Sequence, residues 1–225
     1  MRAGGFGRPL RNLEFLTFEA RAMQSAIAIC NVALSTYLGA ATITALEGPS
    51  PEAEACNLHY DRVRQSLLQR FPWYWAGRRE VLVEETLNDR AGAWAHKYAR
   101  PAHLVAIRWV NHPAAARMAL EAGRSPDSLR ELTATAIYSD MADAVIEYTR
   151  DETDPTLFPP AFADALAASI GAAIAMSITK DVAKKKDAEQ AAALLLDQAM
   201  AMDFNERPAV EHRHVPPNLA VRGIV

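Results

Sequence analysis

ICNVALSTYLG, residues 29–39, and AATITALEGPSPEAEACNLHYDRVRQSLLQRFPWYWAGRR, residues 40–79, form the stretch that decides the fold. Its apolar residues recur at helical spacing in two runs, and a short turn separates the runs. Pro72 and the rings of Trp73, Tyr74 and Trp75 close the second run. The stretch therefore predicts a helical hairpin, and the rest of the chain is expected to pack against it.

The first helix is expected over residues 25–38. Gly39 follows it, in the position where a left-handed residue commonly ends a helix. The apolar stripe of this helix consists of Ile27, Cys30, Leu34 and Leu38.

The second helix has a clear start signal. Ser50 is a suitable N-cap, Pro51 suits the first helical position, and two acidic residues in the first turn complement the helix dipole. The face expected to be buried carries Cys56, Tyr60, Val63 and Leu67. The face expected to be solvated carries Asp61, Arg62, Arg64 and Gln65.

Four short motifs follow one another in this stretch: ICN-x-AL, IT-x-LE, A-C-x-x-x-Y-D-x-x-R-x-x-LL and F-P-W-x-x-A. In this order and spacing they resemble the opening of the tail tubular protein A family, the head-to-tail adaptor proteins of short-tailed phages and related particles. The matching residues are Ile29, Cys30, Asn31, Ala33, Leu34, Ile43, Thr44, Leu46, Glu47, Ala55, Cys56, Tyr60, Asp61, Arg64, Leu67, Leu68, Pro72, Trp73 and Ala76. A weaker similarity continues at Trp94, Tyr98, Pro101 and Leu104.

The resemblance implies a structural virion protein and no enzyme, with no cofactor and no metal. Proteins of this family form a ring of twelve copies under the portal protein, join it to the tail nozzle or next tail component, and continue the DNA channel. DNA is then expected to pass through the ring without specific binding. Assembly takes place in the host cytoplasm, and the protein acts at the head-to-tail interface of the virion.

The last residues, 205–225, have no period and hold three prolines. Composition alone leaves open a frayed terminus or an arm that orders on a partner. The resemblance favours the arm, because these adaptors use C-terminal extensions to reach the portal. The residues expected to bind the portal are Pro208, His212, His214, Pro216, Pro217, Leu219, Ile224 and Val225.

The patterns divide the chain into five parts: an N-terminal extension (1–22), a first helical hairpin (23–79), an inserted β region (80–150), a second helical hairpin (151–204) and a C-terminal arm (205–225). The predicted fold class is mainly α (α+β): an antiparallel four-helix bundle with a small inserted antiparallel β-sheet and an extended C-terminal arm. Residues 1–22 lack the apolar core of a signal peptide. Three interpretations stay open: an over-long start, since Met23 could begin the chain, a disordered arm, or a functional extension.

The β region is expected to hold four or so strands. Residues 104–110, 133–138 and 144–148 show strand-like patterns, with Arg108 on the face opposite Trp109. Residues 111–131 read as a polar surface excursion. In the second hairpin, helices are expected over 162–180 and 187–204, with three lysines (184–186) near the break between them.

Composition sets further limits. The net charge of −3 disfavours a protein that binds nucleic acid electrostatically, since such binding needs a basic face. No apolar run approaches the roughly 18 to 20 residues of a membrane span, so no membrane contact is expected. The two cysteines, Cys30 and Cys56, lie on apolar helix faces and are interpreted as core residues in preference to a disulfide or a metal site.

Catalytic signals are weak. Glu84-Glu85 and Asp151-Glu152 are sequence neighbours whose side chains point apart, and His212-x-His214 lacks further metal ligands. The four tryptophans are interpreted as core or inter-subunit packing in preference to a ligand platform. Two alternatives to the adaptor stay open: a virion-associated cell-wall hydrolase, and a small helical scaffolding or regulatory protein.

Overall fold

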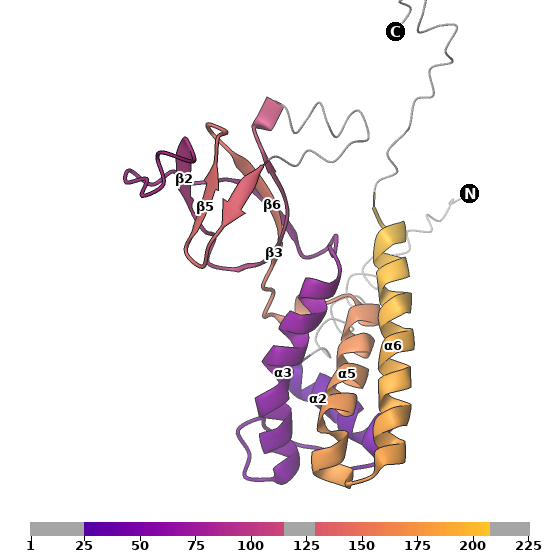
Figure 1. Ribbon diagram of the computed structural model, residues 1–225. Helices are drawn as coiled ribbons and strands as arrows, with labels where there is room; N and C mark the ends of the chain where they lie inside the picture. The colour runs from indigo at the N-terminus through magenta and orange to yellow at the C-terminus, as the bar shows by residue number, and fades with distance from the viewer. Residues whose placement is uncertain (1–24, 115–128, 208–225) are drawn as a thin grey trace, which may run out of the picture. The chain divides into compact units, whose positions relative to one another are not determined.

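A computed structural model describes residues 25–114 and 129–207, and these divide into two compact units (Figure 1). The helical unit consists of residues 25–71 and 152–205. The β unit is built from residues 72–114 and 129–151. The expectations for residues 1–22, for most of the 111–131 excursion and for the arm fall largely outside the described residues.

The helical unit contains helices of very different length. α2 (Ala26–Val32) continues directly as the π-helix η1 (Ala33–Leu38), and α3 (Pro51–Arg70) follows after a loop. The second part holds the 3-10 turn η2 (Pro155–Leu157), α5 (Pro160–Thr179) and α6 (Val182–Asn205).

The predicted ends of the first two helices are confirmed. The hydroxyl groups of Ser25 and Ser50 accept hydrogen bonds from the backbone N–H of Ala28 and Ala53, each at 3.1 Å. Gly39 has a φ of 62° and terminates η1 in the left-handed region. The π-helical hydrogen bonding was not predicted, because one extra residue in a helical turn leaves the apolar spacing almost unchanged.

The loop between η1 and α3 is fastened to α2 by one side chain. The Asn31 amide donates from Nδ2 to the Ile43 carbonyl at 2.9 Å, and its Oδ1 accepts from the Ile43 N–H at 2.7 Å. Both polar atoms of the amide therefore bond to the backbone of a single buried residue. Ile43 is fixed in this way against the helix.

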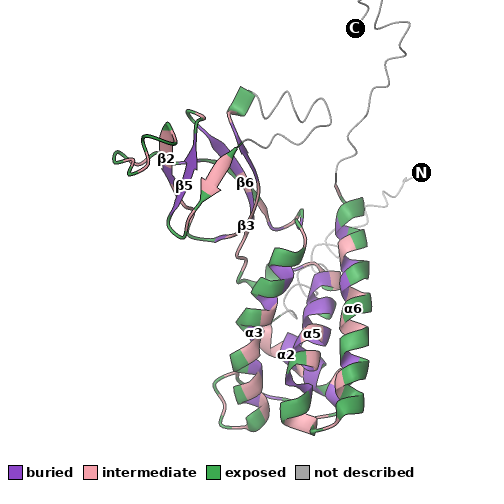
Figure 2. Ribbon diagram, viewed as in Figure 1, coloured by how far each residue is buried: buried purple, intermediate pink, exposed green. Residues whose placement is uncertain are grey.

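α5 lies at the centre of the helical unit, in contact with α2, η1, α3 and α6. Four apolar residues at helical spacing, Phe162, Leu166, Ile170 and Ile174, form a buried ridge on α5, and Figure 2 shows buried residues along much of this helix. Gly171 allows η1 to approach closely, since a Cβ there would lie 3.2 Å from the Cβ of Tyr37. By length and composition, α5 is the one described helix that could cross a membrane, so the prediction that no apolar run is long enough is wrong. With 56% of its most apolar window buried, it also fits the central helix of a packed unit.

α6 begins earlier than predicted. The break lies at Lys180, which has a φ of 53°, and the Asp181 carboxylate accepts from the Ala183 N–H at 2.8 Å to start the helix. The lysine run thus belongs to the first turns of α6. Lys184 donates from Nζ to the Leu38 carbonyl at 2.7 Å, which satisfies a carbonyl group at the end of η1.

The prediction that Arg64 faces solvent is wrong. Its side chain is only 2% exposed, and Nη1 donates to the Glu152 carbonyl at 2.6 Å. Nη2 lies 3.1 Å from the Asp61 carboxylate. The helical position alone could not reveal this role, because the carbonyl partner comes 88 residues later in the chain.

The β unit contains two three-stranded antiparallel sheets. One has the order β1 (Gly77–Val81), β6 (Val145–Arg150), β3 (Leu104–Asn111). The other has the order β2 (His96–Ala99), β5 (Ala136–Ser139), β4 (Arg130–Leu132). Both sheets contribute to one buried core, which contains Leu82, Tyr98, Leu104, Val110, Ile137, Ala144, Ile146 and Tyr148.

The predicted four-helix bundle with one small inserted sheet is therefore wrong. The strand region is a compact unit with two sheets and a core of its own, and the described chain is a mixed α+β fold. In the helical unit, one central helix packs against the others, whereas a four-helix bundle surrounds a shared core with four comparable helices.

Candidate interaction surfaces

The residues expected to bind the portal all lie in the part of the chain that the structure does not describe. These are Pro208, His212, His214, Pro216, Pro217, Leu219, Ile224 and Val225. Their role stays a prediction. Surfaces that can be described come from α6 and from the β unit.

α6 carries apolar side chains on its outer side as well as against α5. Ala188, Leu196 and Ala199 are buried, whereas Leu194 and Met202 are 59% and 57% exposed. Phe204, at the end of the helix, is also exposed. Figure 2 shows this helix with exposed residues along its length. A helix that is apolar on more than one side commonly has a further packing partner.

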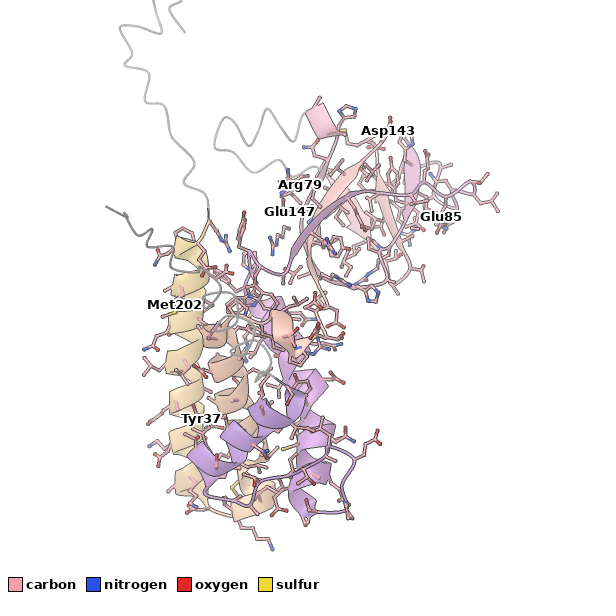
Figure 3. The ribbon with its side chains drawn as sticks, turned by 180° about the vertical axis from the view of Figure 1, so that it is seen from behind. Tyr37, Arg79, Glu85, Asp143, Glu147 and Met202 are labelled. Atoms are coloured by element: carbon pink, nitrogen blue, oxygen red, sulfur yellow. The ribbon has the colours of Figure 1, made fainter. Side chains whose placement is uncertain are left out.

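The β unit contains an open pocket of about 320 Å³, which we call the arginine pocket. It is lined by Tyr74, Gly77, Arg78, Arg79, Arg108 and Glu147. Arg79 and Glu147 lie side by side on this unit in Figure 3.

Strand register explains how the arginine pocket forms. Arg79 on β1 and Trp109 on β3 both lie opposite Glu147, which belongs to the central strand β6. The Arg79 guanidinium stacks 4.9 Å from the centre of the Trp109 ring, and its Nη2 lies 2.7 Å from Glu147 Oε2. The register of β3 shifts between Ile107 and Trp109, so Arg108 is an extra residue in the pairing. Such a bulge re-aims a side chain.

The bulge brings a second guanidinium to the same carboxylate. Arg108 Nη1 lies 3.3 Å from Glu147 Oε1, and Nη2 donates to the Trp73 carbonyl. A Cβ on Gly77 would come within 2.6 Å of Arg108 Nη1, so only glycine leaves room for this arrangement. The sequence predicted that the side chains of Arg108 and Trp109 lie on opposite faces of the strand, because side chains alternate between the two faces of a regular strand. The bulge at Arg108 interrupts this alternation.

A second polar cluster fastens the loop after β1 to the other sheet. Lys97 lies 3.1 Å from Asp89, whose carboxylate also accepts from the Tyr138 hydroxyl at 2.9 Å. These hydrogen bonds lower the pKa of Asp89. The pKa of Glu131 is lowered by its hydrogen bonds with Arg90 and with the indole N–H of Trp94.

The carboxylates considered for a hydrolase do not converge. Glu84 lies 2.7 Å from His96, while Glu85 lies 2.8 Å from Lys97. Among the described residues, the carboxyl pKa values that are clearly shifted, those of Asp89, Glu131 and Asp154, are lowered, whereas a general acid needs a raised pKa.

The tryptophans and cysteines have mixed environments. Trp73 and Trp109 are buried, and Trp73 and Trp75 lie with ring centres 6.5 Å apart. Cys30 and Cys56 are free and fully buried, and the hydrogen bond to Cys56 together with burial raises the pKa of Cys30. Within residues 25–114 and 129–207, no group of three or more possible metal ligands was found; His212 and His214 lie outside this part.

Sequence reasoning missed the arginine pocket. The signal available was the cluster Gly77-Arg78-Arg79 directly after the aromatic run, but neither Arg108 nor Glu147 could be placed beside it without the strand register.

Comparison with known proteins gave no assignment: no protein-family model and no curated protein matches the chain significantly.

Proposed function

We propose that the chain is a head-to-tail adaptor of a tailed phage or a related particle. The observation that carries the proposal is the ordered resemblance to the tail tubular protein A family between Ile29 and Ala76. In this proposal, twelve copies form a ring between the portal protein and the tail nozzle or next tail component. The protein is assembled in the host cytoplasm, acts in the virion, and works by association without catalysis.

The positions that carry the resemblance have definite roles in packing, which supports reading them as one connected motif. Most of them are buried, including Cys30, Cys56 and Leu67, and Asn31 makes both hydrogen bonds to Ile43. A motif whose members contact one another specifies a local fold more strongly than scattered matches.

Four matching positions are exposed: Thr44, Glu47, Asp61 and Pro72. Asp61 pairs with the buried Arg64, whereas burial explains neither Thr44 nor Glu47. In the proposed ring they are candidates for contacts with a neighbouring copy, because exposed residues can act through a partner.

The outer side of α6 supports association between copies. Leu194, Met202 and Phe204 are all more than half exposed on a helix whose inner side is already packed on α5. Contact with a neighbouring subunit would remove this apolar surface from water and stabilise the ring.

The net charge supports free passage of DNA. At −3 the chain lacks the excess of basic residues that phosphate binding requires, so DNA is expected to slide through the channel without specific binding.

The experiment is co-sedimentation with the portal protein encoded in the same genome. The full-length chain and a chain ending at Asn205 are compared. Binding by the full-length chain alone supports both the adaptor function and the role of residues 206–225. Equal binding by both chains keeps the adaptor function but moves the docking surface to residues 1–205. Absence of binding by either contradicts the proposal.

A further inference from the structure

We propose that the arginine pocket binds a carboxylate group from an acidic segment of a partner protein. The proposal concerns the β unit alone and does not depend on the adaptor function.

The arginine pocket has an excess of positive charge. Its lining holds three arginines, Arg78, Arg79 and Arg108, and a single carboxylate, that of Glu147. Each oxygen of Glu147 already accepts from one guanidinium, Oε2 from Arg79 and Oε1 from Arg108. One carboxylate balances only one of the two guanidinium charges that contact it, those of Arg79 and Arg108. A second carboxylate in the pocket would neutralise the remaining positive charge.

The pocket is also held in shape before any ligand binds. The Arg79 guanidinium rests on the Trp109 ring while 53% of its side chain stays exposed to solvent. Arg108 is held between Glu147 and the Trp73 carbonyl in the space that Gly77 leaves. Charged donors that are already oriented lose little conformational entropy on binding, which favours affinity.

The surroundings favour a protein carboxylate over nucleic acid. The chain has a net charge of −3, which disfavours binding of the phosphate backbone of a nucleic acid. A DNA or RNA backbone needs a broad basic surface, whereas one acidic side chain needs only a local fork of donors. The volume of about 320 Å³ is at the lower limit for ligand sites and suits a group of side-chain size.

The position of β1 gives the partner segment a place to lie. Among the described strands, β1 pairs with β6 only, so it forms one edge of its sheet. Extended peptides commonly add to such an edge through backbone hydrogen bonds, while side-chain pockets supply specificity. An acidic residue in that peptide would reach the arginine pocket from the edge strand.

The experiment measures binding of two peptides to the full chain by isothermal titration calorimetry. The probes are acetyl-Thr-Glu-Thr-Glu-Thr-Glu-amide and its counterpart with Gln in place of Glu. We expect the acidic peptide to bind at least about tenfold more tightly, and less tightly as salt is added, because charge-assisted hydrogen bonds carry the difference.

The matched variants are Arg79→Gln in the pocket and Arg62→Gln on the exposed side of α3. We expect Arg79→Gln to weaken acidic-peptide binding about fivefold or more and Arg62→Gln to leave it within about twofold, since both remove the same charge. Arg78→Gln, at an exposed position, replaces Arg79→Gln if the latter fails to fold by circular dichroism. Equal binding of the two peptides, equal effects of the pocket and control variants, or tighter binding of duplex DNA than of the acidic peptide would overturn the proposal.

Discussion

Removal of the Asn31 side chain tests how the loop after η1 is held. Asn31→Ala leaves the N–H and the C=O of Ile43 without their amide partners, which now lie at 2.7 and 2.9 Å. Each hydrogen bond contributes about 0.5–1.5 kcal/mol, and loss of a partner for a part-buried group costs about 1–3 kcal/mol. We therefore expect Asn31→Ala to lower the free energy of unfolding of the helical unit by about 2–3 kcal/mol.

Asn31→Asp tests the two hydrogen bonds to Ile43 separately. The carboxylate still accepts from the Ile43 N–H, but it can no longer donate to the Ile43 carbonyl and instead places a negative oxygen beside it. A protonated carboxyl group can donate again. The destabilisation of Asn31→Asp relative to the wild type is therefore expected to shrink as the pH falls through the pKa of the new carboxyl group.

The assay is urea unfolding followed by circular dichroism at 222 nm, where the helical unit dominates the signal. Asn57→Ala, at an exposed position of α3, is the matched control and is expected to change stability by less than about 0.5 kcal/mol. If Asn31→Ala changed the free energy of unfolding by less than about 0.5 kcal/mol, with the same slope against urea concentration as the wild type, the role assigned to this side chain would be refuted.

Three further changes test other parts of the two units. Arg64→Met removes the buried donor to the Glu152 carbonyl and is expected to destabilise the helical unit by about 2–4 kcal/mol in the same urea assay. Gly171→Ala forces a methyl group to within 3.2 Å of Tyr37, and the overpacking outweighs the gain in helix propensity. The free energy of unfolding is therefore expected to fall by about 1 kcal/mol. The pKa of Asp89 is lowered in the folded state, so its carboxylate stabilises the fold fully above the unfolded pKa of about 3.9, and this stabilisation is lost as the pH falls through the folded pKa. Asp89→Asn should therefore remove this pH dependence of stability, measured by unfolding followed by tryptophan fluorescence.

Each of these changes has a matched control. Arg62→Met alters an exposed arginine on the same helix, and Gly92→Ala adds a methyl group where no atom lies within 4 Å. Asp140→Asn alters another carboxylate of the β unit. Equal effects of a variant and its control would contradict the contact assigned to the variant, as would an unchanged acid dependence in Asp89→Asn.

Local signals in the sequence predicted the helices well. Ser50, Pro51 and Gly39 act within one turn of their own positions, so caps and helix ends could be read from adjacent residues. The ridge of α5 was predictable for the same reason, because its spacing repeats along one element.

Features that depend on distant partners could not be read in this way. Arginine usually lies at the surface, and the burial of Arg64 becomes favourable through its hydrogen bond to the distant Glu152 carbonyl. The strands β2 and β4 have four and three residues, too few to show a reliable alternation. The bulge at Arg108 depends on pairing with β6, so neither the two sheets nor the arginine pocket followed from the sequence.

The central claim is that the chain assembles as a ring on a portal. Mass measurement of the purified portal protein, alone and after mixing with an excess of the full-length chain, tests it most directly. Twelve copies of the 24.6 kDa chain would add about 295 kDa in a single step. A complex with that added mass is the result we expect, and a portal whose mass stays unchanged at saturating concentrations of the chain would contradict the account.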